Sequence, residues 1–169
     1  MRSTRFVFSA VLIVFATMAY AQSDAQKSFD KLKTLAGTWE GVVAGTGSEV
    51  DGKAVHLTLR VTSMGNALMH DMHVDSRPDN PITMVYMDGD RLMLTHYCDA
   101  GNRPRMVAKA SPDGKMVDFE FLDIAGSTQY GHMHGSMFTL VDANHHSEEW
   151  TFMQGDKPIH VHLDLQRVQ

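Results

Sequence analysis

The chain has 169 residues, with 15 lysines and arginines against 20 aspartates and glutamates, and a formal net charge of −5. No run of basic residues stands out, which argues against nucleic acid and anionic membrane surfaces as partners. Cys98 is the only cysteine, so no disulfide can form within the chain and its stability has to come from packing.

The first 21 residues have the features of a secretion signal. Arg2 and Arg5 supply a positive start, an apolar run over 6–18 follows, and Ala-Tyr-Ala at 19–21 matches a small-x-small cleavage site. The apolar run is shorter than the ~20 residues of a membrane-spanning helix, and no cysteine follows it for lipid attachment. We therefore expect cleavage after residue 21, no stable membrane anchor, and a periplasmic or secreted protein.

The mature domain predicted over 22–169 begins with a short amphipathic helix over 24–35. Its apolar residues recur at helical spacing, Asp24 or Ser28 is the expected cap, and Gly37 follows the end of the pattern. The length of this domain suits a single hydrophobic core.

From residue 37 onward the apolar period changes from 3.6 to 2 and does not change back. Turn sequences such as Asp51-Gly52 and Asp113-Gly114 separate the alternating runs at regular intervals. Short hairpins without a linker or a repeat favour an up-and-down meander, and closure of the sheet removes its edges. The predicted fold is all-β: one roughly ten-stranded antiparallel barrel with a short N-terminal helix. The expected strands lie near 37–44, 53–62, 66–75, 82–88, 90–97, 104–110, 115–123, 131–141, 146–154 and 159–168.

Several motifs resemble known barrel families. Gly37-Thr38-Trp39, after a short helix, resembles the opening of the calycin superfamily, which includes lipocalins and fatty-acid-binding proteins. The segments 88–98 and 101–106, together with 131–134 and 149–152, are similar to a family of uncharacterised exported bacterial lipocalin-like proteins. This resemblance implies a barrel that encloses a cavity, and it implies no particular activity.

The same opening, with the glycines at 45 and 47, also resembles the nitrobindins, which are ten-stranded haem-binding barrels. That resemblance implies haem bound through a late histidine, for which His160 and His162 are the candidates. The cofactor content is otherwise left open by the sequence.

His96 is the central candidate for a ligand-binding residue. Leu92, Leu94 and His96 are every second residue of a predicted strand and therefore share one face, which is otherwise apolar. A buried imidazole on such a face needs a hydrogen-bond partner or a function. Tyr97 follows His96 on the same strand, and the hairpin before it brings Tyr86 close. We expect these side chains to form a polar anchor inside an apolar cavity or at its mouth.

Arg105, on the next predicted strand, has two interpretations. Its guanidinium suits a carboxylate or phosphate, whereas the lipocalin resemblance implies that it packs on Trp39 and closes the barrel. The expected ligand-binding set is completed by Trp39 itself, by Trp150 on a strand face that mixes charge and aromatic rings, and by the histidines His132 and His134.

Two His-x-His pairs, at His132 and His134 and at His160 and His162, each place two imidazoles on one face of a strand. With Glu148 or Asp164 they are candidate ligands for a divalent ion. The pattern of cupin metal sites expects a glutamate a few residues after such a pair, and 136–141 contains none. Solvated or hydrogen-bonded histidines are therefore the simpler interpretation, and no metal is predicted.

Catalytic motifs are weak. Cys98 shares a strand face with His96, but no third group that would orient the base is recognisable from spacing, so no catalytic residue is predicted. Methionines such as Met72 and Met133 recur on the predicted strands and would either line a pliable cavity or fill an ordinary core.

The leading functional hypothesis is an exported barrel that binds a small, partly apolar molecule in its cavity. Three alternatives stay open: a haem or metal protein, an enzyme that acts on a bound molecule with histidine as acid and base, and a protein-interaction module. The sequence indicates neither the ligand nor the oligomeric state.

Overall fold

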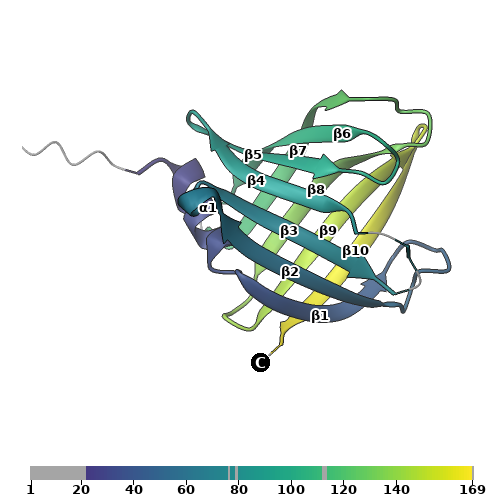
Figure 1. Ribbon diagram of the computed structural model, residues 1–169, viewed down its shortest axis with the longest axis horizontal. Coiled ribbons are helices and arrows are strands. Elements are labelled where there is room, and N and C mark those ends of the chain that lie inside the picture. The colour runs from purple at the N-terminus through teal and green to yellow at the C-terminus, as the bar shows by residue number, and fades with distance from the viewer. Residues whose placement is uncertain (1–21, 76, 79, 112–113, 169) are drawn as a thin grey trace, which may run out of the picture.

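Ten antiparallel strands follow one short helix in the computed structural model (Figure 1), which describes residues 22–75, 77, 78, 80–111 and 114–168. The predicted signal segment, 1–21, lies outside these described residues. The elements are α1 (Asp24–Lys33), β1 (Gly37–Ala44), β2 (Ala54–Thr62), η1 (Ser63–Gly65), β3 (Ala67–Val74), β4 (Ile82–Asp88), β5 (Arg91–Tyr97), β6 (Arg103–Ala110), β7 (Met116–Ala125), β8 (His132–Leu140), β9 (His145–Gln154) and β10 (Lys157–Arg167).

The strands form one closed barrel. Each strand pairs with its neighbours in the chain, and β1 pairs with β10, so no edge is left open. At this closure Trp39 lies opposite Arg167, and Ala44 lies opposite His162. The predicted all-β, ten-stranded antiparallel barrel is confirmed, and every predicted strand agrees with the observed one to within two residues at each end.

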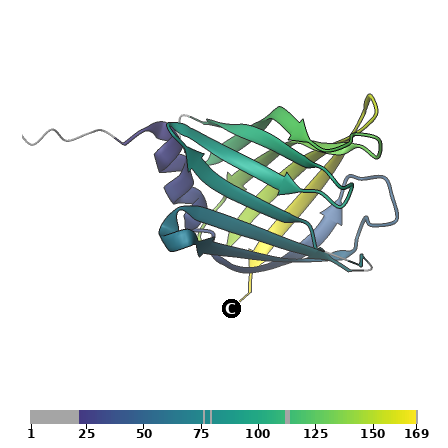
Figure 2. The same cartoon turned by 45° about the horizontal axis from the view of Figure 1, so that its top comes forward.

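Helix α1 covers one end of the barrel, next to β4, β5 and β6 (Figure 2). Its cap is Ser23, whose hydroxyl accepts a hydrogen bond from the backbone N–H of Gln26 at 3.1 Å. The expected caps, Asp24 and Ser28, are wrong because both residues are already helical, and Ser28 is buried towards the barrel. The buried side chains of Phe29 and Leu32 join the helix to the core.

Trp39 closes the same end of the barrel. Its side chain is fully buried, and its indole N–H donates to the carbonyl of Leu35 at 2.8 Å. The guanidinium of Arg167 lies 4.1 Å from the centre of the indole ring, a distance typical of cation–π contacts. Arg167 also donates to the carbonyl of Ala36 at 2.8 Å, which ties the last strand to the segment between α1 and β1.

The expectation that Arg105 packs on Trp39 is therefore wrong. Arg105 is exposed on the outer wall, where its guanidinium makes two hydrogen bonds to the carboxylate of Asp123. The reason is topological: β10 is the neighbour of β1 and presents Arg167 directly opposite Trp39, whereas β6 lies on the far side of the barrel.

Replacement of Trp39 by alanine is predicted to lower the free energy of unfolding by ~3–5 kcal/mol, because a large buried side chain is lost and a cavity remains. Urea unfolding of both proteins measures the difference. Val42→Ala, on the exposed face of the same strand, is the control and is expected to change stability by less than ~0.5 kcal/mol. If Trp39→Ala melts within a degree or two of the parent, Trp39 does not close the barrel.

Candidate functional site: an apolar cavity with a buried histidine

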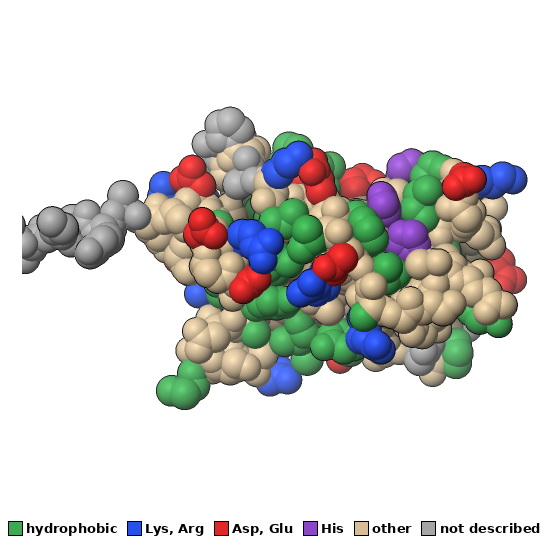
Figure 3. Space-filling model, turned by 90° about the horizontal axis from the view of Figure 1, so that it is seen from above, with side chains coloured by type: hydrophobic (Ala, Val, Ile, Leu, Met, Phe, Trp, Pro, Cys, Tyr) green, Lys and Arg blue, Asp and Glu red, His purple; other side chains and the backbone are tan. Residues whose placement is uncertain are grey.

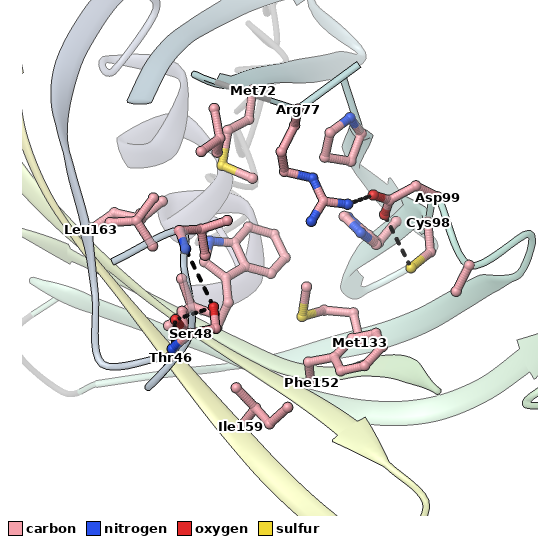
Figure 4. Close-up of a pocket in the computed structure, with 18 of the residues that line it drawn as sticks. Thr46, Ser48, Met72, Arg77, Cys98, Asp99, Met133, Phe152, Ile159 and Leu163 are labelled. Atoms are coloured by element: carbon pink, nitrogen blue, oxygen red, sulfur yellow. Dashed lines mark hydrogen bonds and ion pairs between the residues drawn. The ribbon is translucent and has the colours of Figure 1, made fainter. Parts of the chain in front are cut away.

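A cavity of about 410 Å³ opens at the end of the barrel opposite α1 (Figure 4). Its walls are the inward-facing side chains of the strands that end there, together with the connecting loops. Most of these side chains are apolar, which is usual for sites that bind small molecules. The apolar lining includes Val43, Met72, Met133, Phe152, Val161 and Leu163.

Polar groups lie at two levels of the cavity. At the mouth, Arg77 forms an ion pair with Asp99, and the hydroxyls of Thr46 and Ser48 are hydrogen-bonded to each other at 2.8 Å (Figure 4). Arg77 and Asp99 are the charged residues among the described residues that line the cavity. The mouth is therefore polar, and its two opposite charges already neutralise each other.

His96 is the most buried polar residue of the lining, with a relative exposure of 3%. Its Nδ1 is hydrogen-bonded to the hydroxyl of Thr83 at 2.8 Å, and its Nε2 has no hydrogen-bond partner among the described residues. Burial lowers the pKa of His96 to about 4, and nearby His70 acts in the same direction. His96 thus presents a neutral imidazole with one nitrogen free to bind a ligand.

Below the cavity lies a fully buried carboxylate, that of Glu148. It accepts hydrogen bonds from His70 Nε2 at 3.0 Å, His146 Nε2 at 3.1 Å and Trp150 Nε1 at 2.8 Å. Burial alone would raise the pKa of Glu148, but the two histidines hold it well below its usual range. We call Glu148, His70, His146 and Trp150 the carboxylate cluster.

Trp150 separates this cluster from the cavity. Its indole belongs to the cavity lining, while its N–H points to Glu148. The ring centre lies 5.5 Å from that of His96 and 5.6 Å from that of His70. His96, which faces the cavity, and His70, which belongs to the buried cluster, are thus packed against the same indole.

His70 was not predicted as a site residue, and Glu148 was predicted only as a possible additional ligand in a metal site. A signal for both was present. His70 alternates with Leu68 and Met72 on β3, and Glu148 alternates with His146 and Trp150 on β9. Polar residues on the buried face of a strand need partners, and their presence on two strands indicated an internal network.

Three of the predicted ligand-binding residues lie outside the cavity. Tyr86 is hydrogen-bonded to Thr95 at 3.0 Å, Tyr97 is half exposed, and Arg105 bonds to an exposed carboxylate. The expected grouping of Tyr86, Tyr97 and Arg105 with His96 is wrong, because successive side chains on a strand point to opposite faces. The barrel wall therefore separates them from the imidazole.

Of the remaining candidates, Trp150 lines the cavity and Trp39 lies at the closed end. His132 and His134 lie on the outer wall, where their ring nitrogens are 3.2 Å apart and the ring of His134 stacks on Phe121. Figure 3 shows a group of histidines on one outer face of the barrel.

His160 and His162 also lie on the outer wall. Their inward-facing neighbours, Val161 and Leu163, line the cavity, whereas His160 bonds to Thr151 and His162 is paired with an exposed glutamate. These late histidines therefore do not fit a haem bound inside the barrel. Among the described residues, no group of three or more histidine, cysteine, aspartate or glutamate side chains could hold a metal ion.

No family model and no curated protein matches the chain. Among solved structures it is similar to Rv2717c from M. tuberculosis, with a TM-score of 0.60 and 14% sequence identity. The match covers 84% of this chain and 98% of that one. At this identity the likeness supports the barrel fold and does not indicate a shared activity.

The pKa of His96 leads to a prediction about acid stability. Since the imidazole has a pKa of about 4 when folded against an ordinary value of 6.5, the unfolded chain binds the extra proton between these values. Stability should therefore fall as the pH is lowered from 6.5 to 4, by about 3 kcal/mol from this group. Urea unfolding across this range measures it. The free energy of unfolding of His96→Gln should fall correspondingly less over this range, and His160→Gln on the outer wall should behave like the parent. Equal pH dependence of stability in all three proteins would contradict a lowered pKa of His96.

Proposed function

We propose that this protein is an exported, lipocalin-like barrel that binds a small, partly apolar molecule in its cavity. The observation that carries the proposal is one nearly buried imidazole, that of His96, with a free nitrogen in an apolar cavity of about 410 Å³. A closed calycin-like barrel and the resemblance to exported lipocalin-like proteins support the same function.

The walls of the cavity and His96 would contribute to binding in different ways. Apolar surface such as that of Leu163 and Phe152 would contribute most of the affinity, at roughly 25 cal/mol per Å² removed from water. The imidazole would fix the orientation of the ligand by one hydrogen bond. Binding fits the site better than catalysis, because Nδ1 of His96 is held by the hydroxyl of Thr83 rather than by a carboxylate that would stabilise a charged imidazole.

Export is the second part of the proposal, and it rests on the signal features of residues 1–21. Among the described residues, no helix has the length and apolar character needed to cross a membrane. We predict that protein recovered from the periplasm or the medium begins at Gln22, as N-terminal sequencing would show. Recovery of a cytosolic protein that keeps Met1 would refute export.

Adjacent valines on β1 give a matched test of the cavity. Val43 is buried and lines it, whereas Val42 is exposed on the outer wall. Val43→Trp should fill the cavity and abolish binding of Nile red, an uncharged apolar dye, while Val42→Trp should bind it like the parent. Fluorescence titration measures binding, and melting temperatures show whether both variants are folded. Equal dye binding by the two folded variants would overturn the cavity as the binding site.

The natural ligand can be sought in the same material. Mass spectrometry of compounds released by denaturation should find a molecule in the parent and in Val42→Trp that is depleted in Val43→Trp. A compound retained in equal amounts by both variants would not be a ligand of this cavity.

A further inference from the structure

The deep part of the cavity lacks a cation for an anionic ligand. The one positively charged lining residue among those described is Arg77, which lies at the mouth and is already paired with Asp99. His96 is neutral at physiological pH, so it cannot balance a carboxylate either. An ionised group that entered this region would lose its water without gaining an opposite charge, which strongly disfavours it.

The histidines of the carboxylate cluster supply no cation to the cavity either, because neither His70 nor His146 belongs to its lining. Glu148 lies directly behind Trp150, to which it is hydrogen-bonded at 2.8 Å. His70 and His146 both use Nε2 to bind Glu148, and the Nδ1 atoms of both are buried without a partner among the described residues. No ring nitrogen of His70 or His146 therefore reaches the cavity to pair with an anionic ligand.

The free nitrogen of His96 selects for a hydrogen-bonding group without charge. The Thr83 hydroxyl can donate to Nδ1 or accept from it, so Nε2 is either a donor or an acceptor. A ligand hydroxyl serves in both cases, since it can accept or donate. The cavity volume of about 410 Å³ lies within the roughly 300–1,000 Å³ of sites that bind small organic molecules.

Building on the proposed function, we infer that the ligand is an uncharged alcohol or phenol that places its hydroxyl on Nε2 of His96 and its apolar part along the cavity walls. Carboxylates of the same size are rejected, because the deep cavity offers them no cation. The inference concerns the head group and leaves the shape of the apolar part open.

Three probes with the same ten-carbon chain test the inference on the purified full-length mature protein. 1-Decanol, decanoate and decylammonium are each titrated against bound Nile red at pH 7.5. We expect decanol to displace the dye at a concentration at least tenfold lower than decanoate. Decylammonium should also need a higher concentration than decanol, because a charged head group of either sign would lose its water in the deep cavity without meeting an opposite charge. Displacement by either charged probe at the same concentration as decanol would overturn the choice of an uncharged head group.

His96→Phe removes the nitrogen and keeps a ring of similar size. It should raise the decanol concentration needed for displacement about tenfold, the effect of one buried hydrogen bond, and leave decanoate nearly unchanged. His160→Phe, on the outer wall, is the matched control and should match the parent. An unchanged decanol titration in folded His96→Phe would overturn the inference.

The outcomes separate the inference from the proposed function. Decanoate that displaces the dye as readily as decanol overturns the choice of ligand, while the cavity remains a binding site. Nile red that binds while decanol fails to displace it also overturns the inference. Failure of the dye itself to bind, or equal binding by Val43→Trp and Val42→Trp, counts against the proposed function.

Discussion

The interior of this barrel is organised around one buried carboxylate. Glu148 is fully buried and bonds to His70, His146 and Trp150. A buried charge is strongly unfavourable unless hydrogen bonds replace its lost hydration, so these donors must hold their places whenever the barrel is folded. His70 is on β3 and the other members are on β9, strands that are not neighbours in the sheet. The cluster therefore links two distant parts of the wall through the interior.

This link divides the barrel into a packed half and a hollow half. On the packed side, the ring centres of Trp39 and His146 lie 4.2 Å apart with the rings nearly perpendicular, and Arg167 covers the indole. On the hollow side, Trp150 forms a wall of the cavity next to His96. Removal of Glu148 would leave three buried donors without an acceptor, so we regard it as the residue that sets the position of the cavity wall.

The bounds of the strands could be predicted closely because the sequence patterns that mark them are local. Alternation and turn residues are properties of short windows, and the observed strands match the predicted ones to within two residues. It was harder to predict which side chains of each strand point into the barrel and which point outward. His96 was correctly placed on an apolar face with Leu92 and Leu94, yet Tyr86 and Arg105 were grouped with it although the alternation of their own strands turns them outward.

Contacts across the barrel could not be predicted from a single sequence. His70 and Glu148 are 78 positions apart, and no local pattern pairs them. The partner of Trp39 was likewise predicted from resemblance as Arg105, whereas strand order gives that place to Arg167. Such pairs follow from closure of the sheet, which brings the first and last strands together only in the complete fold.

The methionines show how a fixed head-group site can coexist with adaptable walls. The sequence left open whether they fill a core or line a cavity, and they do both: Met93 and Met106 are fully buried in packed regions, while Met72 and Met133 line the cavity. Thioether side chains change shape at low cost, whereas His96 is held by Thr83 and by its packing on Trp150. Selectivity should therefore be strict for the group that meets the imidazole and tolerant for the shape of the apolar part.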